Sequence, residues 1–381
     1  MTINYEKLML VSISRILLLA ILAFILALSG QLPGPGVSAQ ADTSILNSLS
    51  GSWENLDSYI TLNLCAAAPT LGAKEAGVYQ CSPSQLSLVS GNLFNASAFV
   101  SATDSVLNIA DTLRKSEINS SDIKKLFSEF NYSEYLINTQ VGYVGNGFTV
   151  GIRPLHWQGQ FQFHNPNLPL GSLELRDDIE AFAGYGLGFE WESVHFGMGT
   201  QGTLVFREET LSEASLVDLA ARSASELIEK QTQAGGFLDI GVFAEKRGWV
   251  SASLLFKDIG QFWSGQQLSG RTLFIKQDRT PKLFSAISFI PEIGVGSLQV
   301  GLEVISFLDQ PNVLRDQWIG SLSYFVGPLR ILSGFRPNLL RTGLGLKFSK
   351  FEVALAQEWI NRLDDGRQAQ PHLTLEMTAG L

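Results

Sequence analysis

Apolar and polar residues alternate along strand-length segments from about residue 135 to the end of the chain. The last segment places Leu373, Leu375 and Met377 on one face, and Thr374 and Glu376 on the other. A period of two is typical of half-buried strands. The sequence predicts strands at 86–100, 135–144, 148–164, 179–191, 193–206, 236–246, 248–257, 282–290, 295–306, 315–327, 328–336, 339–348, 351–361 and 371–381.

Short turns join several of these segments. Gly145-Asn146-Gly147, Lys246-Arg247-Gly248, Gly327-Pro328 and Asp364-Asp365-Gly366 all have the residues of tight turns. Parallel strands would need long, usually helical crossovers, which are absent between most segments. About fourteen segments joined in this way predict an all-β, antiparallel barrel, and an even number is typical of single-chain bacterial barrels.

The N-terminus predicts export. Lys7 and Arg15 precede an apolar run from Ile16 to Leu28, and Ala39-Gln40-Ala41 offers a cleavage site. This run is short for a membrane helix, which needs about 20 residues. We therefore predict a cleaved signal peptide over residues 1–41, with an uncleaved anchor as the alternative.

The two faces of the strands have different characters. In the segment 181–191, Tyr185, Leu187 and Phe189 share a face, while the opposite face is mostly glycine. In an exported chain this predicts a transmembrane barrel whose apolar face meets lipid and whose polar face lines a lumen. A soluble exported β-sandwich is the alternative. The candidate lumen-facing residues are Gly184, Gly186, Gly188, His195, Gly197, Gly199, Glu303, Arg341, Lys347 and Glu352.

Glycines in two neighbouring strands predict a crowded interior. Glycine weakens an isolated strand, so a row of glycines is better explained by the close approach of something inside the barrel. A plug, a helix or the tail of a ligand would each account for it.

Residues 42–134 differ from the rest of the chain. They contain the first strand and two stretches at helical spacing, Asp104 to Leu113 and Ser121 to Phe130. We predict a small, partly helical plug-like segment, with a periplasmic subdomain or an ordinary globular core as alternatives. Cys65 and Cys81 are the only cysteines of this exported chain, which predicts a disulfide between them. We predict that residues 135–381 form the main part of the barrel.

One long connection has a helical pattern. Thr210 and Glu213 have the spacing of a capping box, Leu216 and Leu227 begin and end an apolar face, and Gly235-Gly236 follows. We predict a loop helix near 210–230, either at the barrel rim or at the membrane interface.

Composition and motifs exclude several classes of function. The formal net charge of −9 argues against nucleic acid as a partner. The four histidines have no metal-ligand spacing, and the sequence lacks the common hydrolase and phosphate-binding motifs. Among the four histidines, only His195 lies on a predicted glycine-rich inner face. Asp177-Asp178 is predicted to be a solvated turn. We predict no enzyme activity, no cofactor and no metal.

At the level of motifs the chain resembles the FadL-like outer-membrane superfamily, in particular its TraF-like and PorV-like branches. The resemblance depends on the signal peptide, on Thr70-Leu71-Gly72-Ala73, on Cys81-Ser82-Pro83-Ser84-Gln85-Leu86 before the first strand, and on the long meander that follows. Ser82-Pro83-Ser84 stands where that superfamily has an Asn-Pro-Ala type of turn. The resemblance implies a fourteen-stranded barrel with an N-terminal plug, in a superfamily of hydrophobic-compound transporters and secretion-related or conjugation-related proteins.

Two functions follow as predictions. The first is a passive channel or transporter for small hydrophobic molecules in the outer membrane of a Gram-negative bacterium. The second is a non-transporting barrel that acts as partner or scaffold of a secretion, conjugation or envelope-assembly system. The predicted partners are outer-membrane lipid, a hydrophobic small molecule, an envelope-machinery protein and, during biogenesis, the barrel-assembly machinery.

Overall fold

The computed structural model describes residues 82–89, 92–103, 106, 132–164, 170–215, 228–246, 249–269, 281–289, 292–293, 296–307, 318–336, 339–348, 351–360 and 370–380. They form the 3-10 helix η2 (Pro83–Leu88) and a series of strands. The strands are β1 (Asn92–Thr103), β2 (Tyr132–Gly145), β3 (Phe148–His164), β4 (Leu170–Trp191), β5 (Val194–Ser215), β6 (Ile228–Lys246), β7 (Val250–Ser269), β8 (Lys282–Phe289), β9 (Glu292–Ile293), β10 (Gly296–Phe307), β11 (Trp318–Val326), β12 (Leu329–Arg336), β13 (Leu339–Phe348), β14 (Phe351–Ile360) and β15 (Gln370–Gly380).

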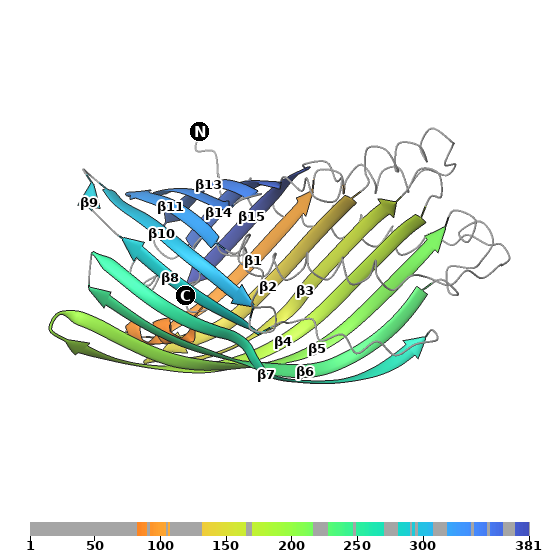
Figure 1. Ribbon diagram of the computed structural model, residues 1–381, viewed down its shortest axis with the longest axis horizontal. Coiled ribbons are helices and arrows are strands. Elements are labelled where there is room, and N and C mark those ends of the chain that lie inside the picture. Colours follow the sequence, from red (N-terminus) through yellow and green to blue (C-terminus); the bar gives the residue numbers. More distant parts are fainter. Residues whose placement is uncertain are drawn as a thin grey trace, which may run out of the picture.

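The strands close into an antiparallel barrel (Figure 1). Strands that follow one another in sequence pair, except that β8 pairs with β10 and not with β9, and β1 pairs with β15 and β10 with β11 to close the ring. Of the 15 strands in the sheet, the two-residue β9 pairs only with the start of β10, which leaves fourteen strands in the ring. The fold predicted from the sequence, an antiparallel barrel of about fourteen strands, is therefore confirmed for the described part of the chain.

Tight turns set the register at one end of the barrel. Asn146 and Gly147 connect β2 to β3 with φ of 51° and 81°, the two positive values that a type I′ hairpin requires. Glu192 and Ser193 connect β4 to β5 with φ of 49° and 67°. Gly327 has φ of 55° between β11 and β12. We call this end of the barrel the short-turn end.

The barrel has its apolar side chains outside and its polar side chains inside. On β4, Ile179, Leu187 and Phe189 are exposed, whereas Asp178 and Glu180 on either side of Ile179 are buried. A soluble domain shows the opposite distribution. The outer face is therefore suited to lipid and the inner face to a lumen.

The height of the apolar band fits a bilayer. On β4 it extends from Ile179 to Trp191, twelve steps of about 3.3 Å, or roughly 30 Å along the membrane normal at a tilt of about 40°. A bilayer core is about 30 Å thick. Aromatic pairs gather at the short-turn end, including Phe189 on Phe196 with ring centroids 5.2 Å apart and Trp249 on Phe289 at 5.9 Å. Such girdles are typical of the membrane interface.

Strands β4 to β7 are long (Figure 1). Each has 19 to 22 residues, whereas β8 has 8 and β10 to β15 have 8 to 12. Beyond Ile179 and Phe206 the next outward residues are the charged Asp177 and Glu208, and Lys230 Nζ lies 3.8 Å from Glu208 Oε1 with both side chains half-exposed. This end of the barrel, the long-strand end, therefore rises above the lipid on one side.

Several predicted boundaries were wrong. The first strand begins at Asn92 and not at residue 86, because Pro83–Leu88 form η2. The predicted helix near 210–230 is wrong at both ends, since Thr210 and Glu213 lie in β5 and residues 228–230 begin β6. Long-range pairing with β4 and β6 overrides the local capping-box pattern. Residues 216–227 lie outside the described part of the chain.

Other predictions concern residues that the structure does not describe. These are the signal peptide over 1–41, the segment 42–81 with Cys65 and Cys81, and the turn at Asp364-Asp365. The two short helices over 104–113 and 121–130 also lie outside the described residues, apart from Val106.

Candidate functional site

Helix η2 lies inside the barrel at the short-turn end, against β4, β5 and β6. Pro83 starts it, because proline fixes φ and lacks the N–H that a first helical residue does not use. Gln85 N–H donates to Ser82 O at 3.1 Å, and Ser87 Oγ donates to Ser84 O at 2.8 Å. Leu86 is fully buried and packs with Val144 of β2. These contacts fix a short segment within the lumen.

Glycines of the barrel wall make room for η2. A Cβ added at Gly199 would lie 2.2 Å from Pro83 O, and one at Gly186 would lie 2.8 Å from Leu86 Cβ. A Cβ at Gly241 of β6 would lie 2.6 Å from Ser82 Oγ. Real Cβ atoms do not approach so closely, so only glycine allows this contact. We call Gly186, Gly188, Gly197, Gly199 and Gly241 the glycine seat.

His195 lies in β5 beside the glycine seat. Its Nε2 is 3.3 Å from Ser87 Oγ, and its ring stacks on Phe243 at a centroid distance of 5.6 Å. The Ser87 hydroxyl already donates to Ser84 O, so the imidazole is the donor in the contact with Ser87. In register, Glu190 of β4 and Glu245 of β6 flank His195. His195 therefore connects η2 to the wall.

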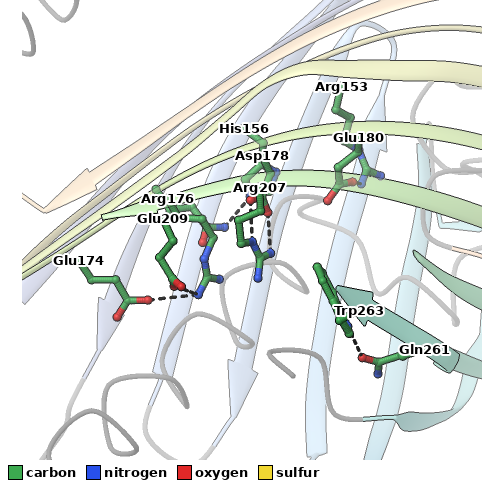
Figure 2. A network of polar contacts seen from close by, with 11 residues as sticks. Arg153, His156, Glu174, Arg176, Asp178, Glu180, Arg207, Glu209, Gln261 and Trp263 are labelled. Carbon is green, nitrogen blue, oxygen red and sulfur yellow. Dashed lines mark hydrogen bonds and ion pairs between the residues drawn. The ribbon is translucent and has the colours of Figure 1, made fainter. Parts of the chain in front are cut away.

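An ion-pair cluster occupies the inner face at the long-strand end (Figure 2). Arg207 of β5 and Asp178 of β4 are directly opposite in register and form a bidentate pair, Nε to Oδ1 at 2.7 Å and Nη2 to Oδ2 at 2.6 Å. Both side chains are only 1% exposed. The guanidinium carbon lies 5.2 Å from the centre of the Trp263 ring. The prediction that Asp177-Asp178 forms a solvated turn was wrong, because both residues lie within β4 and Asp178 is buried.

The same cluster continues on both sides of this pair. Arg176 Nη2 lies 3.1 Å from Glu174 Oε1 and 3.3 Å from Glu209 Oε1, and Gln231 donates to the other oxygen of Glu209. Arg153 of β3 pairs with Glu180 of β4 and donates from Nε to Gln140 Oε1 at 3.1 Å. Opposite charges thus join β3 to β4 and β4 to β5. We call Arg153, Glu174, Arg176, Asp178, Glu180, Arg207 and Glu209 the ion-pair cluster.

Apolar side chains lie between these two regions. Phe182 of β4, Val205 of β5 and Phe237 of β6 are buried, and the Arg153 guanidinium lies 5.5 Å from the centre of the Phe182 ring. On β2 and β1, Leu136 and Phe99 are also buried, but the register places them alongside Arg176 and Asp178. The inner wall formed by β4, β5 and β6 is therefore layered, with the glycine seat at one end, an apolar layer in the middle and the ion-pair cluster at the other end.

The remaining predicted lumen residues are distributed over the ring. Gly184 lies at the level of Gln201, and Glu303 of β10 is buried, opposite Ala286 of β8. Lys347 of β13 is half-buried and is opposite Glu352 of β14. Arg341 of β13 is opposite Glu358 of β14, and the side chains of Arg341 and Glu352 lie outside the described part. These four charged residues are not part of the ion-pair cluster, which sequence reasoning missed.

A signal for the ion-pair cluster was present in the sequence. Glu174, Arg176, Asp178 and Glu180 alternate with outward residues at a period of two. Extending the β4–β5 hairpin outward from its Glu192-Ser193 turn pairs Asp178 with Arg207. Opposite charges at positions that a tight turn aligns indicate a strand pair.

Metal chemistry and helical membrane spans receive no support from the described residues. No group of three or more His, Cys, Asp or Glu among them is arranged to hold a metal ion. In the same part of the chain, no helix has both the length and the apolar character to cross a membrane.

Comparisons of the sequence give no match, either to a family model or to a curated protein. The structure is similar to solved outer-membrane β-barrels at very low sequence identity. The Pseudomonas putida toluene transporter TodX has 9% identity and a TM-score of 0.41, over 80% of this chain and 93% of TodX. The translocator domain of the autotransporter NalP from Neisseria meningitidis has 9% identity and a TM-score of 0.38, over 89% and 99%. CdiB from Acinetobacter baumannii has 9% identity and a TM-score of 0.34, over 77% and 60%.

Proposed function

We propose that this protein is a passive, non-catalytic channel or transporter for small hydrophobic molecules in the outer membrane of a Gram-negative bacterium. The observation that carries the proposal is the closed ring of fourteen strands with an apolar band outside and a layered wall inside. Export by a cleaved signal peptide and insertion by the barrel-assembly machinery belong to the same proposal.

The apolar layer supports the class of cargo. Phe182, Val205 and Phe237 form a buried apolar layer midway along the inner wall, between η2 and the ion-pair cluster. A hydrophobic molecule gains about 25 cal/mol per Å² of apolar area that it buries there. Each carboxylate of the ion-pair cluster is paired with an arginine, and Arg176 serves both Glu174 and Glu209, so the cluster does not oppose the passage of an uncharged molecule.

Transport by the purified full-length protein tests this proposal. The protein is refolded into liposomes, and uptake of ethylbenzene and of a small sugar is compared with uptake by protein-free liposomes. We expect faster uptake of ethylbenzene, and faster uptake of the sugar alone would contradict a hydrophobic cargo. A correctly folded barrel, shown by a mobility shift on boiling, that transports neither would overturn the proposal.

A second function is favoured by a different observation. The wall formed by β4 to β7 rises above the apolar band and exposes Asp177, Glu208 and Lys230. A charged wall beyond the lipid is a suitable surface for a partner protein, which supports the role of scaffold. Photo-crosslinking from position 208 in cells tests it, since a defined adduct with one envelope protein is the expected result and recovery of the barrel alone contradicts it.

A further inference from the structure

We infer that three amide side chains on β2 and β3, Asn138, Gln140 and Gln158, form a binding site for an uncharged hydrogen-bonding group of the cargo. We call these residues the amide patch. The inference rests on the proposed channel function and specifies its substrate class: a small hydrophobic molecule that carries a hydroxyl, phenol or carboxamide group.

The amide patch lies on the inner wall beside the ion-pair cluster, because Gln158 of β3 is opposite Arg176 of β4 and Arg153 donates to Gln140. Asn138 and Gln140 are two residues apart on the inner face of β2, and Asn138 is opposite His156 of β3. Gln158 is two residues from His156 on the same face, and its Nε2 bonds to His156 Nε2. All three amides are more than nine-tenths buried, with exposures of 7%, 2% and 3%.

Each amide retains one polar atom that forms no hydrogen bond with the described residues. In the part of the chain that the structure describes, these atoms are Asn138 Oδ1, Gln140 Nε2 and Gln158 Oε1. A buried polar atom without a partner costs about 1–3 kcal/mol, and most such atoms in native proteins are satisfied. The two oxygens are acceptors and the nitrogen is a donor, so a ligand group that both donates and accepts hydrogen bonds would satisfy them.

The backbone is also irregular at this point. The register of β2 with β3 shifts between Thr139 and Val141, and that of β3 with β4 shifts between Arg153 and His156. Pro154 lies within the second shift and has no N–H for the ladder. Bulges of this kind redirect side chains and are frequent beside binding sites. Gln140 lies within the first shift, so its side chain is aimed by the bulge.

The neighbouring charges exclude an ionic ligand. Arg153, the nearest cation, is held by Glu180 and by Gln140 Oε1. Arg207 donates from both Nε and Nη2 to the carboxylate of Asp178. A carboxylate entering here would meet Glu180 and Asp178 without a cation of its own, and an ammonium group would have to displace an arginine from a buried pair. A neutral group avoids both penalties.

Apolar side chains border the amide patch. Phe99 of β1 is directly opposite Asn138, and Leu136 lies two residues from Asn138 on the same inner face. Phe182 lies beneath the Arg153 guanidinium, next to Gln140 (Figure 2 shows Arg153 and its partner Glu180). A ligand with an apolar body and one neutral polar group would contact both kinds of surface at once.

Three probes with the same apolar body test the inference: 4-ethylphenol, ethylbenzene and 4-ethylbenzoate. Binding to the full-length protein in liposomes is measured by titration calorimetry, with protein-free liposomes subtracted. We expect 4-ethylphenol to bind about tenfold more tightly than either of the others, which is the effect of one good hydrogen bond. Equal binding of ethylbenzene, or tighter binding of 4-ethylbenzoate, would overturn the inference.

Two variants and a matched control test whether the preference for 4-ethylphenol depends on the amide patch. Gln140→Glu keeps the acceptor for Arg153 and removes the free donor, and Asn138→Leu removes a free acceptor. Each is expected to reduce the preference for 4-ethylphenol to about threefold or less. Gln201→Leu alters a buried amide of β5 outside the patch, at the level of Gly184, and is expected to leave the preference unchanged. A mobility shift on boiling confirms folding in each case.

The outcomes separate this inference from the proposed function. Transport of ethylbenzene without any preference for the phenol would overturn the amide patch as a cargo site and retain the channel. Wild-type preference in both patch variants would indicate that the free atoms hold only water. A folded barrel that neither binds nor transports any probe would overturn both.

Discussion

The two ends of the barrel are held together by different physical means. At the short-turn end, glycines let η2 approach the wall so closely that backbone and side-chain atoms of the helix contact the strands directly. At the long-strand end, charged side chains join neighbouring strands across the inner face. The first end depends on shape and the second on charge. A short segment inside the barrel has to fit its seat, whereas strands that continue beyond the apolar band have to stay paired with one another.

The largest effect is expected at the long-strand end, from Arg207→Met. This change leaves Asp178 buried without its bidentate partner, and breaking a buried pair costs about 3–5 kcal/mol. Urea unfolding followed by tryptophan fluorescence measures the loss.

The double variant R207M/D178L is the matched control for this change. Removing both charges of a buried pair is far less harmful than removing one, so the double variant is expected to recover most of the stability. A double variant as unstable as Arg207→Met would show that the charges do not act as a pair.

The second effect is expected at the short-turn end, from Gly199→Val. The new Cβ would lie 2.2 Å from Pro83 O, so η2 must leave its seat, at a cost of about 1–3 kcal/mol. We expect the barrel to remain folded, η2 to become sensitive to protease and solute uptake to rise.

Gly202→Ala is the control on the same strand. Nothing lies within 4 Å of a Cβ at Gly202, so neither protease sensitivity nor uptake is expected to change. Unaltered protease sensitivity in Gly199→Val would contradict the glycine seat.

A smaller effect is expected from Ser87→Ala. The change removes the hydroxyl that contacts Ser84 O and His195 Nε2, and a hydrogen bond contributes about 1 kcal/mol. Protease cleavage within residues 82–89 is expected to become a few times faster, with no loss of global stability. A fall in global stability as large as that of Arg207→Met would mean that the seat and the barrel are one cooperative unit.

The smallest effect is expected from Lys230→Ala. Lys230 and Glu208 form an ion pair on the outer face, where solvent screens it, and such pairs contribute between 0 and about 1 kcal/mol. We expect no measurable change in the urea midpoint. A loss comparable to that of Arg207→Met would show that position, and not burial, decides how much a pair contributes.

Where lipid imposes a strict alternation, the sequence alone was enough to locate the strands. The segments predicted at 148–164 and 339–348 match β3 and β13 in full, and fourteen strands were expected in total. On β4, residues 170–178 were missed because Asp177 interrupts the outward apolar face. On β5, Glu208 and Glu209 are polar on both faces, and Thr210 and Glu213 imitate a helix cap. Outside the membrane the outward residues no longer need to be apolar. The alternation of apolar and polar residues is therefore lost there, although the strand continues.

The candidate site could be predicted only in part. A row of glycines indicated the close approach of something inside the barrel, and it is η2 that lies against Gly186 and Gly199. The partner of each glycine could not be read from the sequence, because η2 is about a hundred residues away from β5. Predicting the ion-pair cluster would have required the register of the β4–β5 hairpin. The turn at Glu192-Ser193 fixes this register with two positive φ values, and neither glutamate nor serine is typical of that conformation.

The position of η2 also imposes an order on assembly. Helix η2 precedes β1, and the ring is sealed by the seam between β1 and β15, the first and last strands in the sequence. The seat that receives η2 is formed by β4, β5 and β6, which are synthesised after η2 but well before β15. A segment enclosed by a ring is most easily placed while the ring is still open. We therefore expect η2 to occupy the glycine seat before β1 pairs with β15. If the ring closed first, η2 would remain outside the barrel.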